Sequence, residues 1–384
     1  TIVNEELKSF KVLEKEIYSY VCELAREITG QMLESYDEEL AQSRDKKVYR
    51  GKGKRTTSIK TVYGEVEYSR EGYRTKTKDG QTAHVFLLDH AMHMDKIGLI
   101  STNLAEKIAL TVTESPYRVT AEQISSTCGQ SISAGGVWNM MQRLGERIDE
   151  EEIQAVKQME ADQTEGEKVI PVLFEEMDGV WLHIQDEHHK KMKKQEMKVF
   201  TMYEGWDEEK EKQKRSTLVG KSMLAGMENS NDFHAKREAC IRKKYAADEI
   251  EQRILNGDGG SWIKEPYDSD AIFQLDRYHI YQEILRKISN KDAQKEIRTL
   301  FDEEKMDEML EYIQIYATSV ASPDEKDKSS KKAMELYQYL NNNKNGLLPY
   351  DKRGIKIPAP QKGILYKGMG IQETQNCTVI TLRM

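Results

Sequence analysis

The chain has 384 residues, more than one ordinary hydrophobic core accommodates, so two or three domains are expected. Charged residues make up 32% of the sequence, the mean hydropathy is -0.74, and no apolar run approaches the roughly 18 residues of a membrane-spanning helix, which predicts a soluble protein without a membrane partner. The net charge of -8 argues mildly against nucleic acid, but the charge is segregated: seven Lys or Arg and no acid lie between Lys46 and Lys60.

The N-terminus alternates charged and apolar residues and lacks the apolar core of a signal peptide. The four cysteines lie more than a hundred residues apart, so they form neither a disulfide framework nor a zinc motif. Both features predict a cytoplasmic protein.

Apolar side chains recur at helical spacing through residues 5–43, which are predicted to form a helix. A β-hairpin is predicted over 56–75, a segment rich in Thr, Val and Tyr with Gly64 at the turn. The basic stretch that leads into it makes Lys52, Lys54 and Arg55 candidates for contact with a DNA backbone. A solvated basic loop is the alternative.

A helix-turn-helix is predicted next. Thr120 to Gln123 match a capping box, and Val119 with Ile124 fits a hydrophobic staple, which together start the first helix near Thr120. This helix is expected to end near Cys128.

Ser133 can cap the second helix, whose predicted buried stripe is Val137, Met141 and Leu144. On its outer face lie the candidate groove-reading residues, which are Asn139, Gln142 and Arg143. A helical hairpin that only packs is the alternative.

The most informative region follows an acidic helical connector. Residues 168–185 are predicted to form a long strand whose even-numbered positions from Ile170 to Ile184 are apolar except for Glu176 and Asp178. Further strands are predicted at 197–203, near 217–226, at 253–263 and at 271–275, with a helix at 234–247 between the third and fourth strands. Three strands joined as hairpins, then a helix and another strand, make up the first two-thirds of an RNase H-like sheet.

Residues 276–345 show mostly helical patterns, broken by a linker-like segment at 322–332 and by 341–346. Near the end of the chain, Gly368 and Gly370 mark a loop, and a helix is predicted to start near Gln372.

Three acids lie within or at the ends of the predicted strands and helices. Asp178 interrupts an apolar strand, where an unpartnered carboxylate is costly to bury, Asp258 lies in the turn Asn-Gly-Asp-Gly-Gly, and Glu373 follows a Gly-rich loop. Taken singly, each has a structural alternative as a turn former or a helix N-terminal charge. Taken in order, they suit two Mg²⁺ or Mn²⁺ ions that support in-line attack on a phosphodiester.

Four motifs occur in order: FEEMDGVWLHIQ at 174–185, NGDGGSWIK at 256–264, LDRYH at 275–279 and YKGMGIQETQN at 366–376. Over nearly the whole chain they resemble the Mutator-like DDE transposases of bacterial insertion sequences, of the kind called IS-Lre-two, which are often filed as an uncharacterised transposase-like family.

The resemblance implies that Asp178, Asp258 and Glu373 are the catalytic, metal-binding acids. Asp276 and His279 match an Asp-x-x-His signature at the start of a helical insertion, and they could hydrogen-bond each other or DNA, or be a satisfied structural contact. The implied activity is cleavage at the ends of a mobile element by water, followed by attack of the 3′-hydroxyl on target DNA. Its partners would be double-stranded DNA with terminal inverted repeats and further copies of the chain, as a dimer or larger assembly at the bacterial nucleoid.

The expected architecture is α+β and multidomain, with an RNase H-like mixed sheet as the catalytic core. Its parts are an N-terminal helix and basic hairpin (1–110), a helix-turn-helix with connector (111–165), the core strands (166–275), an all-helical insertion (276–360) and a truncated catalytic helix with the final Glu (361–384).

The family normally continues past the final Glu, whereas here eleven residues follow Glu373. This departure favours a rival interpretation, a truncated or inactive transposase-derived DNA-binding regulator, while retention of all three acids opposes it. A second rival is a helical interaction protein with no nucleic-acid role. His188 and His189 are interpreted as part of a solvated hairpin loop, with a metal or DNA contact as the alternative. Trp181 and Trp262 are interpreted as core packing near the site, with base stacking by Trp262 as the alternative.

Overall fold

Residues 9–381 are described by a computed structural model, apart from 78, 95–99, 164–165, 185–192, 265–270 and 322–327. Over these residues the protein is α+β, with about half of them in helices and with three β-sheets. The chain divides into two compact units, one up to residue 150 and one from residue 151. None of the described helices is long and apolar enough to cross a membrane.

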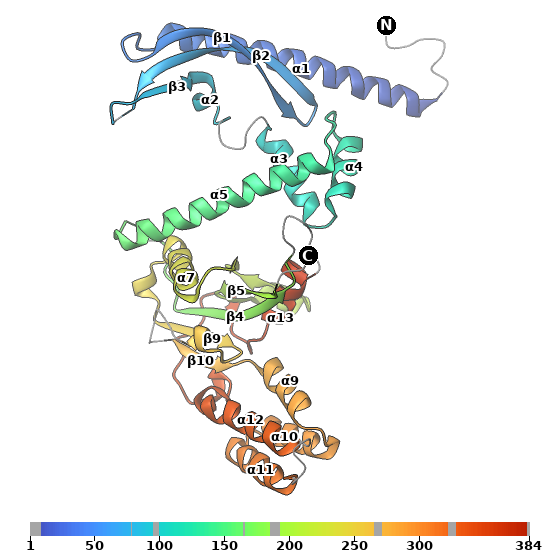
Figure 1. The fold of residues 1–384 in the computed structure, drawn as a ribbon, viewed down its shortest axis with the longest axis vertical. Coiled ribbons are helices and arrows are strands. Elements are labelled where there is room, and N and C mark those ends of the chain that lie inside the picture. Colours follow the sequence, from blue (N-terminus) through green and yellow to red (C-terminus); the bar gives the residue numbers. More distant parts are fainter. Residues whose placement is uncertain are drawn as a thin grey trace. The chain divides into compact units, whose positions relative to one another are not determined.

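The first unit begins with a long helix that packs on a three-stranded antiparallel sheet (Figure 1). Its elements are α1 (Phe10–Ser43), β1 (Arg50–Thr61), β2 (Gly64–Lys76) and β3 (Thr82–Phe86), with the strand order β1-β2-β3. The predicted hairpin is confirmed, and Gly64 has the positive φ of +127° that its turn requires. The apolar spacing correctly predicted α1, but Phe10, Val21 and Leu24 are exposed, and Leu33 lies on the buried side.

Three helices complete this unit, after the short α2 (Leu87–Ala91): α3 (Thr102–Val112), α4 (Tyr117–Thr127) and the start of α5 (Ala134–Glu160). Their small core includes Leu104, Ile108, Ile124 and Val137. The two predicted helices with a turn between them are therefore confirmed. The Ser133 hydroxyl accepts a hydrogen bond from the Gly136 N–H at 3.1 Å, as expected of a cap.

The predicted start of α4 is wrong. The helix begins at Tyr117 after Pro116, so Thr120 and Val119 lie inside it and form neither a capping box nor a staple. Thr120 is fully buried, and its hydroxyl donates to the Ser115 carbonyl at 3.2 Å. Proline fixes φ near the value needed at a helix start and has no N–H to satisfy, so it displaces the later Thr signal.

The buried stripe of α5 also differs from the prediction. Val137 is fully buried as expected, but its partner is Met140, whereas Met141 and Leu144 are only half-buried.

The second unit is built on a five-stranded mixed sheet with the order β10-β9-β4-β5-β8. Its strands are β4 (Val172–Leu182), β5 (Gln195–Tyr203), β8 (Ser222–Gly226), β9 (Gln252–Gly257) and β10 (Ile272–Leu275). The first three are antiparallel neighbours, whereas β9 and β10 join β4 in parallel. All five predicted strands are present. The third is preceded by a separate β7 (Leu218–Val219), and the fourth ends at Gly257, before α8 (Ser261–Lys264).

The two faces of this sheet have different partners. On one face, α7 (Ser230–Lys244) packs through Phe233 and Ile241 against Leu173 and Met177 (Figure 1). On the other face, Phe174 belongs to an aromatic cluster with Tyr203, Trp206 and Tyr350. A small three-stranded sheet near this cluster has the order β11-β6-β7 and was not predicted from the sequence. Besides β7, its strands are β6 (Gly205–Asp207) and β11 (Ile364–Leu365), and α6 (Glu208–Lys212) follows β6.

The helical pattern after the sheet is confirmed by four helices that pack around a common core (Figure 1). They are α9 (Arg277–Lys287), α10 (Lys291–Asp302), α11 (Met306–Ser319) and α12 (Ser329–Asn342). The chain then returns to β4 through α13 (Gln372–Gln375), which continues as a π-helical turn over Asn376–Thr381. The helix predicted near Gln372 is therefore confirmed.

Candidate metal centre

Asp178 and Asp258 follow matching positions on two neighbouring strands. β4 and β9 pair in parallel with Met177 opposite Gly257, so the next residue along each strand is one of the two acids. Side chains alternate between the faces of a strand, which brings Glu176 and Asp178 to the face that carries Phe174. The register of two strands thus brings the backbone of the two acids, eighty residues apart in sequence, to the same end of neighbouring strands.

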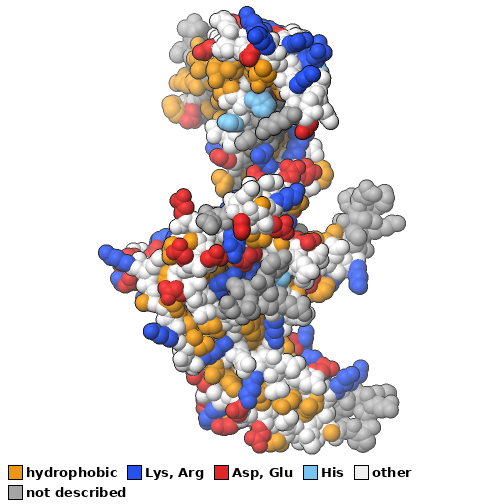
Figure 2. All heavy atoms as spheres, turned by 90° about the vertical axis from the view of Figure 1, so that its left-hand side faces the viewer, with side chains coloured by type: hydrophobic (Ala, Val, Ile, Leu, Met, Phe, Trp, Pro, Cys, Tyr) orange, Lys and Arg blue, Asp and Glu red, His pale blue; other side chains and the backbone are white. Residues whose placement is uncertain are grey.

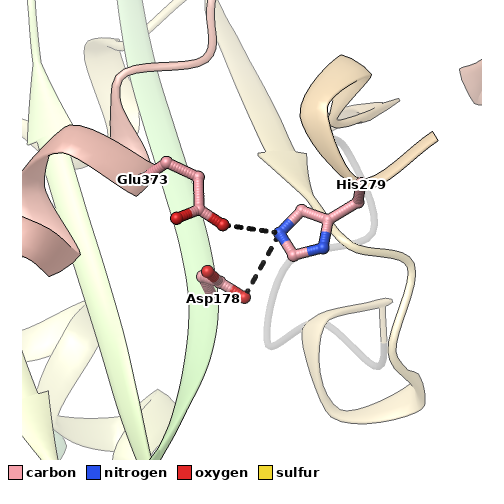
Figure 3. Close-up of side chains that lie close together, drawn as sticks. All are labelled: Asp178, His279 and Glu373. Carbon is pink, nitrogen blue, oxygen red and sulfur yellow. Dashed lines mark ion pairs between the residues drawn. The ribbon is translucent and has the colours of Figure 1, made fainter. Parts of the chain in front are cut away.

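Asp178 forms a close group with His279 and Glu373 (Figure 3). The three side chains come from β4, α9 and α13, and one ligand atom of each lies within 4.8 Å of the others. His279 Nε2 is 3.5 Å from Asp178 Oδ1 and 3.6 Å from Glu373 Oε1. Asp178 is 6% exposed, and the other two are half-buried, so the group opens to solvent on one side.

Asp258 lies beside this group and is not one of its three members. Its Oδ1 accepts a hydrogen bond from the Gly260 N–H at 2.8 Å, within the turn that follows β9. Burial raises the pKa of Asp258, the Gly260 N–H and His279 lower it, and Asp178 and Asp276 raise it. The structure therefore brings together two of the three predicted acids with His279, and the third interacts with them electrostatically.

His279 is held as a cation by the surrounding acids. Burial alone would lower its pKa, but the hydrogen bond and charge of Asp178, with the charges of Asp276 and Asp258, raise that pKa to about 9. Burial and Asp178 raise the pKa of Glu373, while His279 lowers it. Without a metal ion, the imidazolium neutralises part of the acid charge.

Asp276 has a clear structural role. It caps α9: its Oδ1 accepts hydrogen bonds from the backbone N–H of Tyr278 at 2.8 Å and of His279 at 3.4 Å. Its Oδ2 accepts from the Asn256 side-chain amide at 2.6 Å. Asp276 and His279 were predicted either to hydrogen-bond each other or DNA, or to form a structural contact. The structural contact is present, and it orients the first turn of α9, which carries His279.

Three further polar residues, Glu176, Asn256 and Asn376, surround the group and were not predicted from the sequence to take part in it. Asn376 Nδ2 donates to Asp178 Oδ2 at 2.6 Å, and Glu176 is buried beneath the loop before Glu373. Burial raises the pKa of Glu176, partly offset by hydrogen bonds from Tyr203 and from backbone N–H groups of that loop. The sequence did contain a signal for Glu176, because it is a second acid on the same face of the strand, two residues before Asp178.

The residues predicted to contact DNA lie in the first unit. Lys52, Lys54 and Arg55 are exposed on β1, and Lys54 forms an ion pair with Glu38 at 3.0 Å. Lys and Arg side chains gather on the part of the surface that this unit forms, in the upper part of Figure 2.

Asn139, Gln142 and Arg143 are exposed on α5, as predicted. Trp181 is 59% exposed, so the expectation of core packing is wrong for it. Trp262 does pack against Phe233, with ring centroids 5.9 Å apart. His188 and His189 lie outside the described residues.

The donor set suits a hard divalent cation. Asp178 and Glu373 offer carboxylate oxygens, the ligands that Mg²⁺ and Mn²⁺ prefer. Further acids lie close to them: besides burial, the charges of Asp178 and Asp276 raise the pKa of Asp258, and the charge of Asp276 raises the pKa of Glu176. Among the described residues at this site, His279 is the cation that faces these acids, so a bound metal would relieve an excess of negative charge.

The profile of a family described as "Uncharacterised protein family (UPF0236)" matches residues 3–369 of the chain. Three similar proteins are UPF0236 proteins of Caldanaerobacter subterraneus subsp. tengcongensis, each 24% identical to the chain. The first aligns over 337 residues, 86% of this chain and 65% of its own length. The other two align over 298 residues, 77% of this chain and 58% and 55% of their own lengths. The chain thus spans less than two thirds of the length of these relatives.

Proposed function

This chain belongs to the UPF0236 family of uncharacterised proteins, and we propose that it is a DNA transposase that cuts the ends of a mobile element and joins them to target DNA. One observation carries the proposal: Asp178, His279 and Glu373, which come from three distant segments, converge within 4.8 Å, with Asp258 beside them. Such a set of acids is what metal-dependent phosphodiester cleavage requires.

The topology of the sheet supports an RNase H-like catalytic core. Three antiparallel strands are followed by two parallel ones in the order β10-β9-β4-β5-β8, with the first acid on the central strand and the second after its parallel neighbour. The final acid arrives after the insertion of α9 to α12, as the resemblance implies.

The acids would hold the cations in the proposed reaction. Asp178 and Glu373 would be direct ligands and Asp258 a further one, and bound ions would supply activation of a water or 3′-hydroxyl nucleophile and stabilisation of the leaving oxygen. Asn376 fixes one Asp178 oxygen through its amide, which leaves Oδ1 directed towards His279. No covalent protein intermediate is needed.

His279 is proposed to contact DNA. It carries a proton between two carboxylates in the metal-free protein. When a divalent cation occupies the carboxylates, His279 no longer has to neutralise them, and its Nε2–H becomes available to a phosphate oxygen.

DNA recognition is proposed for the first unit. The basic β1 segment with Lys52, Lys54 and Arg55 would contact the phosphate backbone, and the exposed face of α5 with Asn139 and Arg143 would read the terminal repeat. Transposition holds two element ends together, so the active form is proposed to be a dimer or larger assembly.

The names of the relatives offer independent support. The name of the first joins eleven locus labels from one genome, and that of the second joins four. One protein that occurs at many loci is what a self-copying element leaves in a genome.

The test is excision in cells. The gene is placed with its native flanking DNA on a plasmid, and excision is scored for the wild type and for Asp178→Asn, which keeps the shape of the side chain and removes its charge. We expect excision to fall below detection in the variant. The matched control is Asp248→Asn, at an exposed acid whose ion pair with Arg242 lies elsewhere in the same unit.

The outcomes separate the rival functions. Unchanged excision by Asp178→Asn would end the catalytic assignment. DNA binding without excision by the wild type would support the regulator, and no binding to DNA even at low salt would support a protein with no nucleic-acid role.

A further inference from the structure

Glu176 is a fully buried carboxylate without a cationic partner among the described residues, two positions before Asp178 on the same face of β4. We propose that Glu176 is a positioning residue: it anchors the loop before Glu373 and thereby sets where the Glu373 carboxylate lies relative to Asp178. This inference rests on the proposed metal-dependent function of the site.

The loop before Glu373 is held by both oxygens of Glu176. Oε1 accepts from the Gly370 N–H and Oε2 from the Gln372 N–H, each at 3.1 Å. Gln372 directly precedes Glu373, so the anchor is one residue from the proposed ligand. Gly370 has a φ of +121°, a conformation that glycine adopts easily and that lets the backbone turn towards Glu176.

The same carboxylate also contacts the sheet. The Tyr203 hydroxyl donates to Oε1 at 2.6 Å, and the Asn256 amide donates to Oε2 at 3.2 Å. Asn256 simultaneously donates to Asp276, the cap of the helix that carries His279. Glu176 therefore connects, through one shared amide, the segments that carry Glu373 and His279.

A second anchor lies on the far side of Glu373. Asn376 bonds Asp178, and its Oδ1 accepts from the Gln372 side chain at 2.9 Å. The short α13 has four residues and little apolar surface of its own, so these contacts with β4 hold it where packing alone does not.

The chemistry of this anchor requires a carboxylate. Four donors point at its two oxygens, and an ionised carboxylate accepts at both, whereas an amide presents an NH₂ group on one side. Glutamine at this position would oppose either the Gly370 or the Gln372 N–H with another donor. The loop must then shift, although the side chain has almost the same volume.

The experiment compares Mn²⁺ binding to the wild type and to Glu176→Gln by electron paramagnetic resonance of the full chain. We expect the dissociation constant for Mn²⁺ to rise about 10–100-fold, as is typical when the groups that orient metal ligands are changed. In the excision assay, the Mg²⁺ concentration for half-maximal activity should rise, and excess Mg²⁺ should restore much of the rate. A merely structural defect would not be rescued in this way.

Tyr203→Phe is the matched control, because it removes a donor on the sheet side and leaves both loop N–H bonds. We expect it to weaken Mn²⁺ binding less than Glu176→Gln, and thermal unfolding would confirm that both variants fold. A folded Glu176→Gln that binds Mn²⁺ within twofold of the wild type would overturn the proposal.

A third measurement separates this proposal from the proposed function. If the wild type binds no Mn²⁺, the metal-dependent function fails. Amide hydrogen exchange of residues 366–376, measured in the metal-free full chain, then tests whether Glu176 anchors the loop. Faster exchange in Glu176→Gln than in Tyr203→Phe supports the anchor, and equal exchange rejects it.

Discussion

His279 shares one nitrogen between Asp178 and Glu373, so in the metal-free protein an imidazolium occupies the position where a cation is expected. Burial and the charge of Asp178 raise the pKa of Glu373, and the positive charge of His279 lowers it. A proton on His279 and a metal ion on the carboxylates are therefore alternative ways to balance the same charge.

Replacing His279 tests whether its positive charge balances the negative charge of the acids. In His279→Ala the acids lose their cationic partner, and we expect the metal-free protein to lose about 1–3 kcal/mol of stability, the usual range for hydrogen bonds to charged groups. Mg²⁺ should recover most of this loss. Urea unfolding with and without Mg²⁺ measures both effects, and a stability loss that Mg²⁺ leaves unchanged would contradict the interpretation.

Glu175, on the opposite face of β4, is a matched contrast to Glu176. It is bound by Arg237 and Arg253 with N–O distances from 2.5 to 3.0 Å. Burial would raise its pKa, but the charges and hydrogen bonds of the two arginines lower that pKa to about 2.

This shift predicts a pH dependence of stability. Because the folded pKa of Glu175 lies below its ordinary value of 4.5, its contribution is complete above about pH 4.5 and is lost as the pH falls towards 2. Glu175→Gln should cost about 3–5 kcal/mol near neutral pH, since it removes the charged carboxylate that both buried arginines bind. Urea unfolding at pH 5 and pH 3 measures the free energy of unfolding of the wild type and the variant. The difference between the two should be smaller at pH 3, and an equal difference at both pH values would be inconsistent with the lowered pKa.

Among the secondary-structure elements, the pairing of β4 with β9 aligns Asp178 and Asp258. Gly257 lies at the end of this pairing, and a Cβ there would meet the Met177 carbonyl oxygen at 3.0 Å and Ile263 Cγ2 at 2.9 Å. A larger residue must push the end of β9 away from β4.

Gly257→Ala should therefore destabilise the protein by about 1–3 kcal/mol, the typical cost of overpacking, and weaken Mn²⁺ binding. Gly145→Ala in α5 is the control: a Cβ there meets nothing within 4 Å, and alanine favours a helix interior by about 0.5–1 kcal/mol. Thermal unfolding should shift in opposite directions for the two variants. A shift in the same direction would reject the steric argument.

Local sequence patterns predicted the elements that are long and periodic. The alternation in β4 and the helical pattern of α7 were sufficient to predict these two elements, with ends that differ by a few residues. For residues 276–345 the pattern predicted helix in general, without the bounds of the separate helices α9 to α12. The sheet β11-β6-β7 was missed because strands of two or three residues have no period to detect. The start of α4 was misplaced because Pro116 competes with the Thr120 signal.

The candidate site was predictable only in part. The acids Asp178 and Glu373 could be chosen from motifs, but their approach to His279 depends on strand register and on loop contacts between residues almost two hundred positions apart. The roles of Glu176 and Asn256 follow from those contacts, so no local pattern reveals them.

For the whole molecule, the division at residue 150 assigns the proposed DNA contacts and the acid cluster to different units. The first unit carries the basic segment on β1, and the second carries every member of the acid group. The two activities should therefore be separable by substitution.

Replacing Lys52, Lys54 and Arg55 together by alanine should weaken DNA binding and leave Mn²⁺ affinity unchanged. Each lost phosphate contact lowers the salt-dependence slope of log K by about 0.9 on duplex DNA. Lys54 is already paired with Glu38, so we expect Lys54 to contribute the least of the three residues to the change in slope. Binding isotherms at several salt concentrations measure the slope, and an unchanged slope would show that this segment does not contact phosphate.

The alternation of side chains along β4 makes the length of this strand as critical as its composition. Deleting one residue near Val172 would invert which side chains point to each face of the sheet. Asp178 would then turn into the apolar layer beneath α7, and the arginine-bound Glu175 would face the aromatic cluster. We therefore expect point substitutions in this strand to lower stability or metal binding by different amounts. Deleting one residue should instead abolish both the fold of this unit and its candidate metal centre.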